Sequence, residues 1–177
     1  AQQPLSQALV DRGADVNARN ENGGTPLMHA AVSGDLDIVA MFLNSGAKVN
    51  AQAGNGWTPL ALAAAKGHVQ VVHRLLKSGA DANIADAFGW TALMHAAEQK
   101  RLTVVQRLVA QPGIQVDARS VNGTTAFHRA AAQGFSAIAQ MLVQGGADLK
   151  ISDNEGRTAF DYAREAGHPE LLEGLGG

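Results

Sequence analysis

Hydrophobic residues along this chain recur in blocks that repeat every 33 or 34 residues. Each block opens with a threonine, continues with small and apolar residues and closes on alanine, and the five copies occupy residues 25–31, 58–64, 91–97, 125–131 and 158–163. A fixed period of this length indicates a stack of similar supersecondary units, each packed only on its neighbours. A stack offers an extended surface rather than a deep pocket, so the pattern favours a binding protein over an enzyme.

The unit at 53–85 shows how one period folds. Asn55-Gly56 is a tight-turn pair, because glycine adopts a positive φ without a Cβ penalty. Thr58 stands where a helix N-cap belongs, with Pro59 at the first helical position, where its missing N–H costs nothing. Gly67 is placed to end this short helix. Its buried face is predicted to be Leu60, Ala63 and Ala64.

A second helix follows in each unit and supplies most of the larger core side chains. In the same unit its buried stripe is Val71, Val72, Leu75 and Leu76, and Gly79 ends it. We therefore predict paired antiparallel helices in layers, helical content well above half of the residues, and no β-sheet beyond short hairpin pairings. The other predicted core residues are Leu27, Ile38, Phe42, Leu43, Leu93, Val104, Val105, Leu108 and Leu142.

This turn–helix–turn–helix unit resembles the ankyrin repeat. The family's Gly-His turn is matched at Gly67-His68 and Gly167-His168 and more loosely at Gly34-Asp35, and its exit loop is matched at residues 13–17, 46–50, 79–83 and 146–148. The resemblance covers the whole chain and implies a single domain of class all-α, an ankyrin-repeat solenoid with short hairpin fingers. We assign units to residues 20–52, 53–85, 86–119 and 120–152, flanked by a partial unit at 1–19 and a capping unit at 153–177.

The sequence departs from this pattern at both ends and in the third unit. Residues 111–113 place one extra residue in the third exit loop, and Lys100-Arg101 replaces the Gly-His pair. The partial first unit supplies only its second helix, with Leu5, Leu9 and Val10, so we expect its apolar stripe to be poorly covered. At the far end Arg164 replaces an alanine and several glycines close the chain, as in a cap.

Composition narrows the possible partners. The net charge of −2 shows no excess of basic residues of the kind that binds nucleic acid or an anionic membrane. No apolar run approaches the roughly 18 residues of a membrane span. With no cysteine, disulfides and thiolate metal sites are excluded. The chain opens at Ala1 rather than Met, so we expect a processed or cut form.

Six histidines suggest a metal or catalytic site, but their spacing argues against one. His29 and His95 occupy the same position two units apart, which separates them by roughly 20 Å when packed helices lie about 8–10 Å apart. Zinc ligands must each reach within about 2 Å of one ion. The resemblance gives His128 a local bracing role. We expect no cofactor, no metal and no catalysis.

The fingertips hold the best candidates for binding, because the two tryptophans of the chain and Phe88 lie on adjacent tips. Large rigid side chains dominate binding hot spots, although the tryptophans could instead lean back onto neighbouring hairpins. The predicted partner-binding residues are Asn55, Trp57, Phe88, Trp90, Asn122 and Arg157 on the tips, with Lys66 and Gln99 on the inner helix face.

The resemblance implies a non-catalytic module that binds another protein, and we expect a monomer that inhibits or regulates a partner enzyme. The alanine- and glutamine-rich sequence also resembles bacterial ankyrin proteins that act in the periplasm, of which one kind inhibits the cell's own wall endopeptidases. On that basis we expect a periplasmic location, with the cytoplasm as the alternative. A scaffold that stabilises an enzyme without blocking it, or an effector secreted into a host, remain alternative functions.

Overall fold

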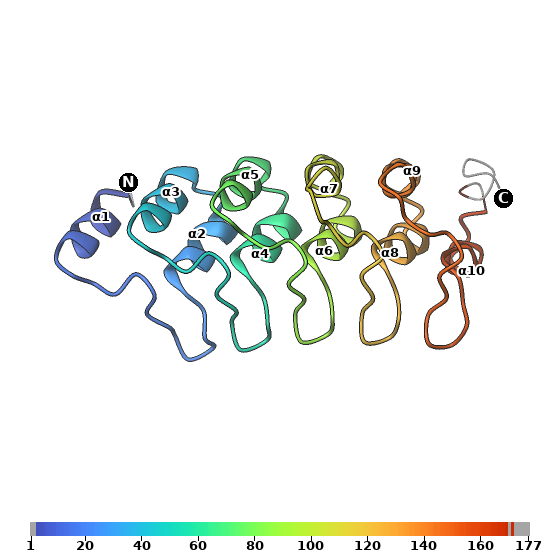
Figure 1. Cartoon of the computed structure of the whole chain (residues 1–177), viewed down its shortest axis with the longest axis horizontal. Helices are drawn as coiled ribbons and strands as arrows, with labels where there is room; N and C mark the ends of the chain where they lie inside the picture. Colours follow the sequence, from blue (N-terminus) through green and yellow to red (C-terminus); the bar gives the residue numbers. More distant parts are fainter. Residues whose placement is uncertain (1–2, 170, 172–177) are drawn as a thin grey trace.

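The computed structural model describes residues 3–169 and 171 as a single row of helix pairs (Figure 1). The first helices of successive units pack side by side: α2 (Pro26–Ser33), α4 (Pro59–Lys66), α6 (Ala92–Glu98), α8 (Ala126–Ala132) and α10 (Ala159–Glu165). The second helices form another row, which lies above the first in Figure 1: α1 (Gln3–Asp11), α3 (Leu36–Asn44), α5 (Val69–Lys77), α7 (Leu102–Val109) and α9 (Ser136–Gln144). The loops that lead into the first helices all project to one side (Figure 1). The architecture is the all-α solenoid that the sequence predicts.

The helices are shorter than we expected, and the prediction of helical content well above half is wrong. Each helix has only seven to nine residues, so helices make up only about half of each unit and turns and hairpins make up the rest. Within the described residues, the only β pairing is one isolated bridge between Ser152 and Thr158.

Local hydrogen bonds explain why the first helices begin where they do. The hydroxyl of Thr58 accepts a hydrogen bond from the backbone N–H of Ala61 at 3.1 Å, and Thr25, Thr91 and Thr158 cap their helices in the same way. At Thr125 the bracing comes from His128, whose Nδ1 accepts from the Thr125 backbone N–H at 3.2 Å. The local role that the resemblance implied for His128 is confirmed.

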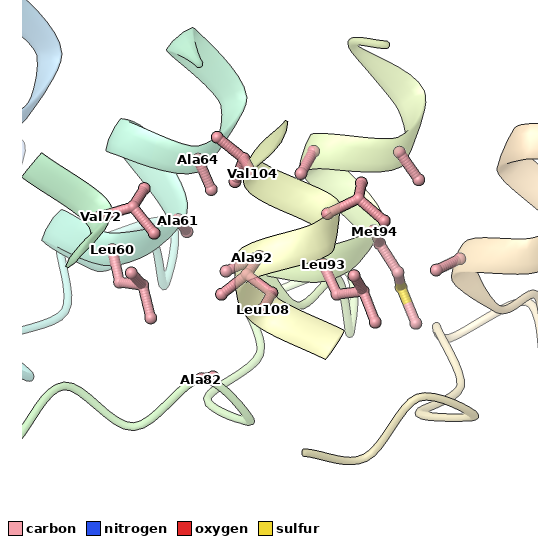
Figure 2. Packing of buried hydrophobic residues seen from close by; sticks show 14 of the residues in the cluster. Leu60, Ala61, Ala64, Val72, Ala82, Ala92, Leu93, Met94, Val104 and Leu108 are labelled. Atoms are coloured by element: carbon pink, nitrogen blue, oxygen red, sulfur yellow. The ribbon is translucent and has the colours of Figure 1, made fainter. Parts of the chain in front are cut away.

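Leucine and valine side chains interlock between the two rows of helices to form the core (Figure 2). Leu60, Leu75, Leu93 and Leu108 are each no more than 1% exposed. Leu43 and Leu76 are only half-buried, contrary to the prediction. Each follows a residue whose side chain faces the core. One step along a helix rotates the side chain by about 100°, which turns these two leucines away from the core.

The irregular third unit preserves the geometry of its neighbours. Lys100 adopts φ 55°, the only positive φ of a non-glycine among the described residues, so it takes the conformation that glycine supplies in other units. Arg101 then replaces the histidine: its Nε donates to the Ala65 carbonyl at 3.0 Å, whereas the ring Nε2 of His68 lies 2.9 Å from the carbonyl of Val32. The exit loop with the extra residue contains Gly113. The side-chain amide of Asn83 donates to the Gly113 carbonyl, as that of Asn50 donates to the Gly79 carbonyl in the preceding unit.

The two ends of the row differ from the inner units. Helix α1 packs against α3 as a second helix would, with Leu9 51% exposed and Val10 half-buried. The side chain of Leu5 lies outside the described residues, as do the glycines that close the chain. Arg164 of α10 is exposed and pairs with Asp161 at 3.2 Å.

Candidate functional site

Five five-residue fingers lead into the first helices and share one backbone fold. In the finger at 86–90, Asp86 N–H donates to the Trp90 carbonyl and Gly89 N–H to the Asp86 carbonyl, each at 2.9 Å, and Gly89 has φ 75°. The same pair of bonds closes the fingers at 20–24, 53–57, 120–124 and 153–157. The backbone conformation of each finger is therefore set by its own hydrogen bonds and its glycine rather than by side-chain packing.

Backbone bonds also join neighbouring fingers. Ala87 N–H donates to the Asn55 carbonyl at 3.0 Å, and Val121 N–H donates to the Phe88 carbonyl at 3.0 Å. A Cβ at Gly56 would stand 2.7 Å from the Ala87 nitrogen, so only glycine permits this approach. The tips form one connected strip, which a partner meets already ordered.

Asp86 organises the third finger. Its Oδ1 accepts from the backbone N–H groups of Phe88 and Trp90, both at 2.9 Å, and its Oδ2 accepts from His95 Nε2 at 2.9 Å. All of these contacts are shielded, because the carboxylate side chain is only 2% exposed. The result is a turn that holds the Phe88 side chain outward, where it is 65% exposed.

The two tryptophans pack on His95, which lies on α6. The ring of His95 lies 4.0 Å from the Trp57 ring and 5.2 Å from the Trp90 ring, centroid to centroid. Burial lowers the pKa of His95 below its ordinary value, against the opposing hydrogen bond and charge of Asp86. The imidazole is therefore neutral at pH 7, with the proton on the nitrogen that faces Asp86. The Arg129 guanidinium lies 4.8 Å from the Trp90 ring centroid.

These side chains surround a hollow of about 420 Å³ that opens to solvent. Phe88 and the equally exposed Val121 (64%) stand beside it. Its lining consists of Trp57, Asp86, Phe88, Trp90, His95, Val121 and Asn122. The structure thus brings four of the eight predicted site residues, Trp57, Phe88, Trp90 and Asn122, to one place.

The other four predicted site residues do not line this hollow. Asn55, Lys66 and Gln99 are exposed, so they remain available to a partner. Arg157 is held within its own finger. Its Nε and one terminal nitrogen donate to Asp153 Oδ2 at 3.2 and 3.0 Å, and its guanidinium carbon lies 4.7 Å from the ring centroid of Tyr162.

Asp153 forms the centre of this last finger. Burial by itself would raise its pKa, but hydrogen bonds from Tyr162, Arg157 and Glu155 hold the pKa of this carboxyl far below its ordinary value. Asp153 in turn raises the pKa of Arg157, and burial followed by Asp153 raises the pKa of Tyr162. Asp153 and Arg157 therefore stay charged, and Tyr162 stays protonated, across the physiological range.

Asp86, His95 and Val121 also line the hollow, although they are not among the partner-binding residues predicted from the sequence. Comparing the units would have found the first two, because Asp86 and His95 are nine residues apart, as are Asp153 and Tyr162. A spacing of nine matches no helical neighbour relation, since it runs from a finger into the helix that follows.

Neither a metal site nor a membrane span appears in the part of the chain that the structure describes. No group of three or more histidine, aspartate or glutamate side chains there could hold an ion. None of its helices is both long enough and apolar enough to cross a bilayer.

Comparison with known families identifies the repeat. Residues 50–120 and 113–176 match the family of ankyrin repeats described as three copies, and residues 9–63 match ankyrin repeats described as many copies. No curated protein matches the chain closely enough to be compared with it. These matches extend from residue 9 to residue 176, and the chain belongs to the ankyrin-repeat family, whose repeats act as protein–protein interaction modules.

Proposed function

We propose that this chain binds a partner enzyme with its fingertips and inhibits it. The observation that carries the proposal is the pair of exposed apolar side chains, Phe88 and Val121, at the mouth of the hollow on adjacent fingers. Both are about two-thirds exposed, which is costly for side chains of this kind unless another surface covers them.

The connected fingers suit such a role because a partner need not order them. Backbone bonds between fingers hold Phe88 and Val121 in place before any contact, so little conformational entropy is lost on docking. The exposed Asn55, Lys66 and Gln99 would form a polar rim around the apolar centre. A rigid strip of this shape would inhibit by covering the mouth of the partner's active-site cleft. A bacterial peptidase in the periplasm is the partner that we propose.

Affinity capture from the source cells tests this function. The parent chain should retain an enzyme from the periplasmic fraction that Phe88→Ala loses, with at least a thirtyfold weaker Kd in the purified complex. The matched control is Leu102→Ala, which changes an exposed leucine (39%) at the start of α7, outside the fingers and outside the lining of the hollow. If Phe88→Ala holds the partner as tightly as the parent, the fingertip site is wrong. If the captured enzyme keeps its full turnover, inhibition is wrong.

A further inference from the structure

The hollow beside Phe88 has a chemical character that specifies what can enter it. Of its seven lining residues only Asp86 carries a charge, and both oxygens of that carboxylate are already bound, by two backbone N–H groups and by His95. The remaining walls are two indoles, a phenyl ring, an imidazole, a valine and an asparagine. An incoming group therefore meets aromatic faces and no free ionic partner.

Charges around the hollow disfavour an ionised occupant of either sign. The Arg129 guanidinium already lies on the Trp90 ring, and no acidic side chain among the described residues pairs with it, so a second cation at this tryptophan would be repelled. An anion would approach the carboxylate of Asp86, which lines the hollow, whereas the Arg129 guanidinium that could attract it is not among the lining residues. Both arguments point to a neutral group.

One polar atom is left over in this apolar setting. His95 uses Nε2–H to donate to Asp86, which leaves the lone pair on Nδ1 as an acceptor in the neutral ring. Among the described residues Nδ1 has no hydrogen-bond partner, and it is not one of their fully buried unpaired atoms. A ligand with a donor hydrogen would satisfy it.

We propose that this hollow takes one neutral aromatic side chain with a polar hydrogen, a tyrosine or tryptophan, presented by the partner protein. The inference rests on the proposed function, since it assigns the anchor residue of the same interface. The volume of about 420 Å³ lies in the lower part of the range for binding sites and holds one aromatic ring rather than a folded ligand. An aromatic ring would pack among Trp57, Phe88 and Trp90, which all line the hollow, while its phenol or indole hydrogen reaches His95.

Capped amino acids test the chemistry of the hollow without a partner. The full ¹⁵N-labelled chain is titrated with N-acetyl-tyrosinamide, N-acetyl-tryptophanamide, N-acetyl-phenylalaninamide and N-acetyl-argininamide while the indole N–H resonances of Trp57 and Trp90 are followed. The first two should produce saturable shifts, with a Kd at least threefold lower than that of the phenylalanine probe, which lacks the donor. The arginine probe should not saturate.

Variants show that the probes bind here. The double substitution Phe88→Ala with Val121→Ala should weaken the tyrosine probe at least fivefold, whereas Leu102→Ala should leave it unchanged. The proposal is overturned if the arginine probe binds more tightly than tyrosine, if phenylalanine equals tyrosine, or if no aromatic probe saturates. Should the probes fail while Phe88→Ala still loses the captured enzyme, the proposed function stands without this anchor. If the probes bind but Phe88→Ala keeps its partner, the hollow is an aromatic site and the proposed interface is wrong.

Discussion

The fingers at residues 86–90 and 153–157 each begin with an aspartate and have the same backbone conformation, yet they present different surfaces. In both, Oδ1 accepts from the N–H groups two and four residues later at 2.9 Å. They differ in the partners of Oδ2. Asp86 holds the neutral His95, whereas Asp153 holds Arg157 and the Tyr162 hydroxyl, at 3.0 and 2.8 Å.

The comparison separates what builds a finger from what it displays. Aspartate and the glycine three residues later fix the turn, and the residues four and nine positions after the aspartate decide whether the finger closes. Arg157 and Tyr162 close the last finger over its own aspartate, which suits the end of a row. Trp90 and His95 leave a hollow beside the third finger, because neither fills the space between this finger and the next.

The largest difference should appear when each aspartate is replaced by alanine. Asp153→Ala removes a carboxylate that is 2% exposed and leaves Arg157 and two N–H groups without their acceptor, so it should lower the free energy of unfolding by about 3 kcal/mol. This value is at the low end for a buried pair because Arg157 is 35% exposed and can be rehydrated. Asp86→Ala releases only neutral donors and should cost about 1–2 kcal/mol. Urea unfolding measures both.

The same experiment has a control within the last finger. Glu155 also pairs with Arg157 but is 74% exposed, so Glu155→Ala should change the free energy of unfolding by less than about 0.5 kcal/mol. Equal losses for Asp153→Ala and Asp86→Ala would show that the two fingers do not differ in the way described here.

A smaller effect is expected at Tyr162, whose hydroxyl donates to Asp153 at 2.8 Å. Tyr162→Phe should lower the free energy of unfolding by about 1–2 kcal/mol, as expected for a half-buried hydrogen bond to a charged group. Because Tyr162 is the only tyrosine in the sequence, alkaline absorbance reports its ionisation alone. The pKa should lie above the ordinary value and fall in Asp153→Asn; an ordinary pKa in the parent would contradict the closed cluster.

The sequence predicted the parts of this picture that depend on local chemistry. Threonine caps, glycine stops and apolar periodicity gave the helix pairs, and the position of Phe88 at a finger tip gave its exposure. The finger-to-helix contacts were missed, because Asp86 pairs with His95 and Asp153 with Tyr162 across a spacing that neither strand nor helix periodicity contains. For the same reason nothing in the sequence indicated that Arg157, a predicted partner-binding residue, also bonds to Asp153 within its own finger.

Acidification should affect the two fingers at different pH values. Burial lowers the pKa of His95, so the unfolded chain binds the proton more readily and the folded state loses stability as the pH falls below about 6.5. The lowered pKa of Asp153 stabilises the fold above its ordinary value of 3.8, and this contribution is lost only under more acidic conditions. Urea unfolding between pH 7 and 5 measures the first effect.

Substitutions separate the contribution of His95 to this pH dependence from the contributions of other histidines. Burial also lowers the pKa of His128. Burial and nearby positive charges lower the pKa of His73 as well, so the parent should lose stability from all three rings over this interval. His95→Gln should reduce the loss without abolishing it, and the double variant with His128→Gln should flatten the profile further. An unchanged profile in His95→Gln would mean that His95 is not held neutral beside Asp86.

The smallest expected change in stability concerns Phe88, the side chain that we propose as the centre of partner binding. Phe88 is 65% exposed and its turn is held by Asp86 and Gly89, so Phe88→Ala should alter the free energy of unfolding by less than about 0.5 kcal/mol. The equivalent position of the last finger, Glu155, should be as tolerant, and only Phe88→Ala should weaken partner binding. Urea unfolding alongside the binding assay separates the two readouts. A loss of stability above 1 kcal/mol in Phe88→Ala would mean that the ring supports the finger, and its exposure would then no longer argue for a partner.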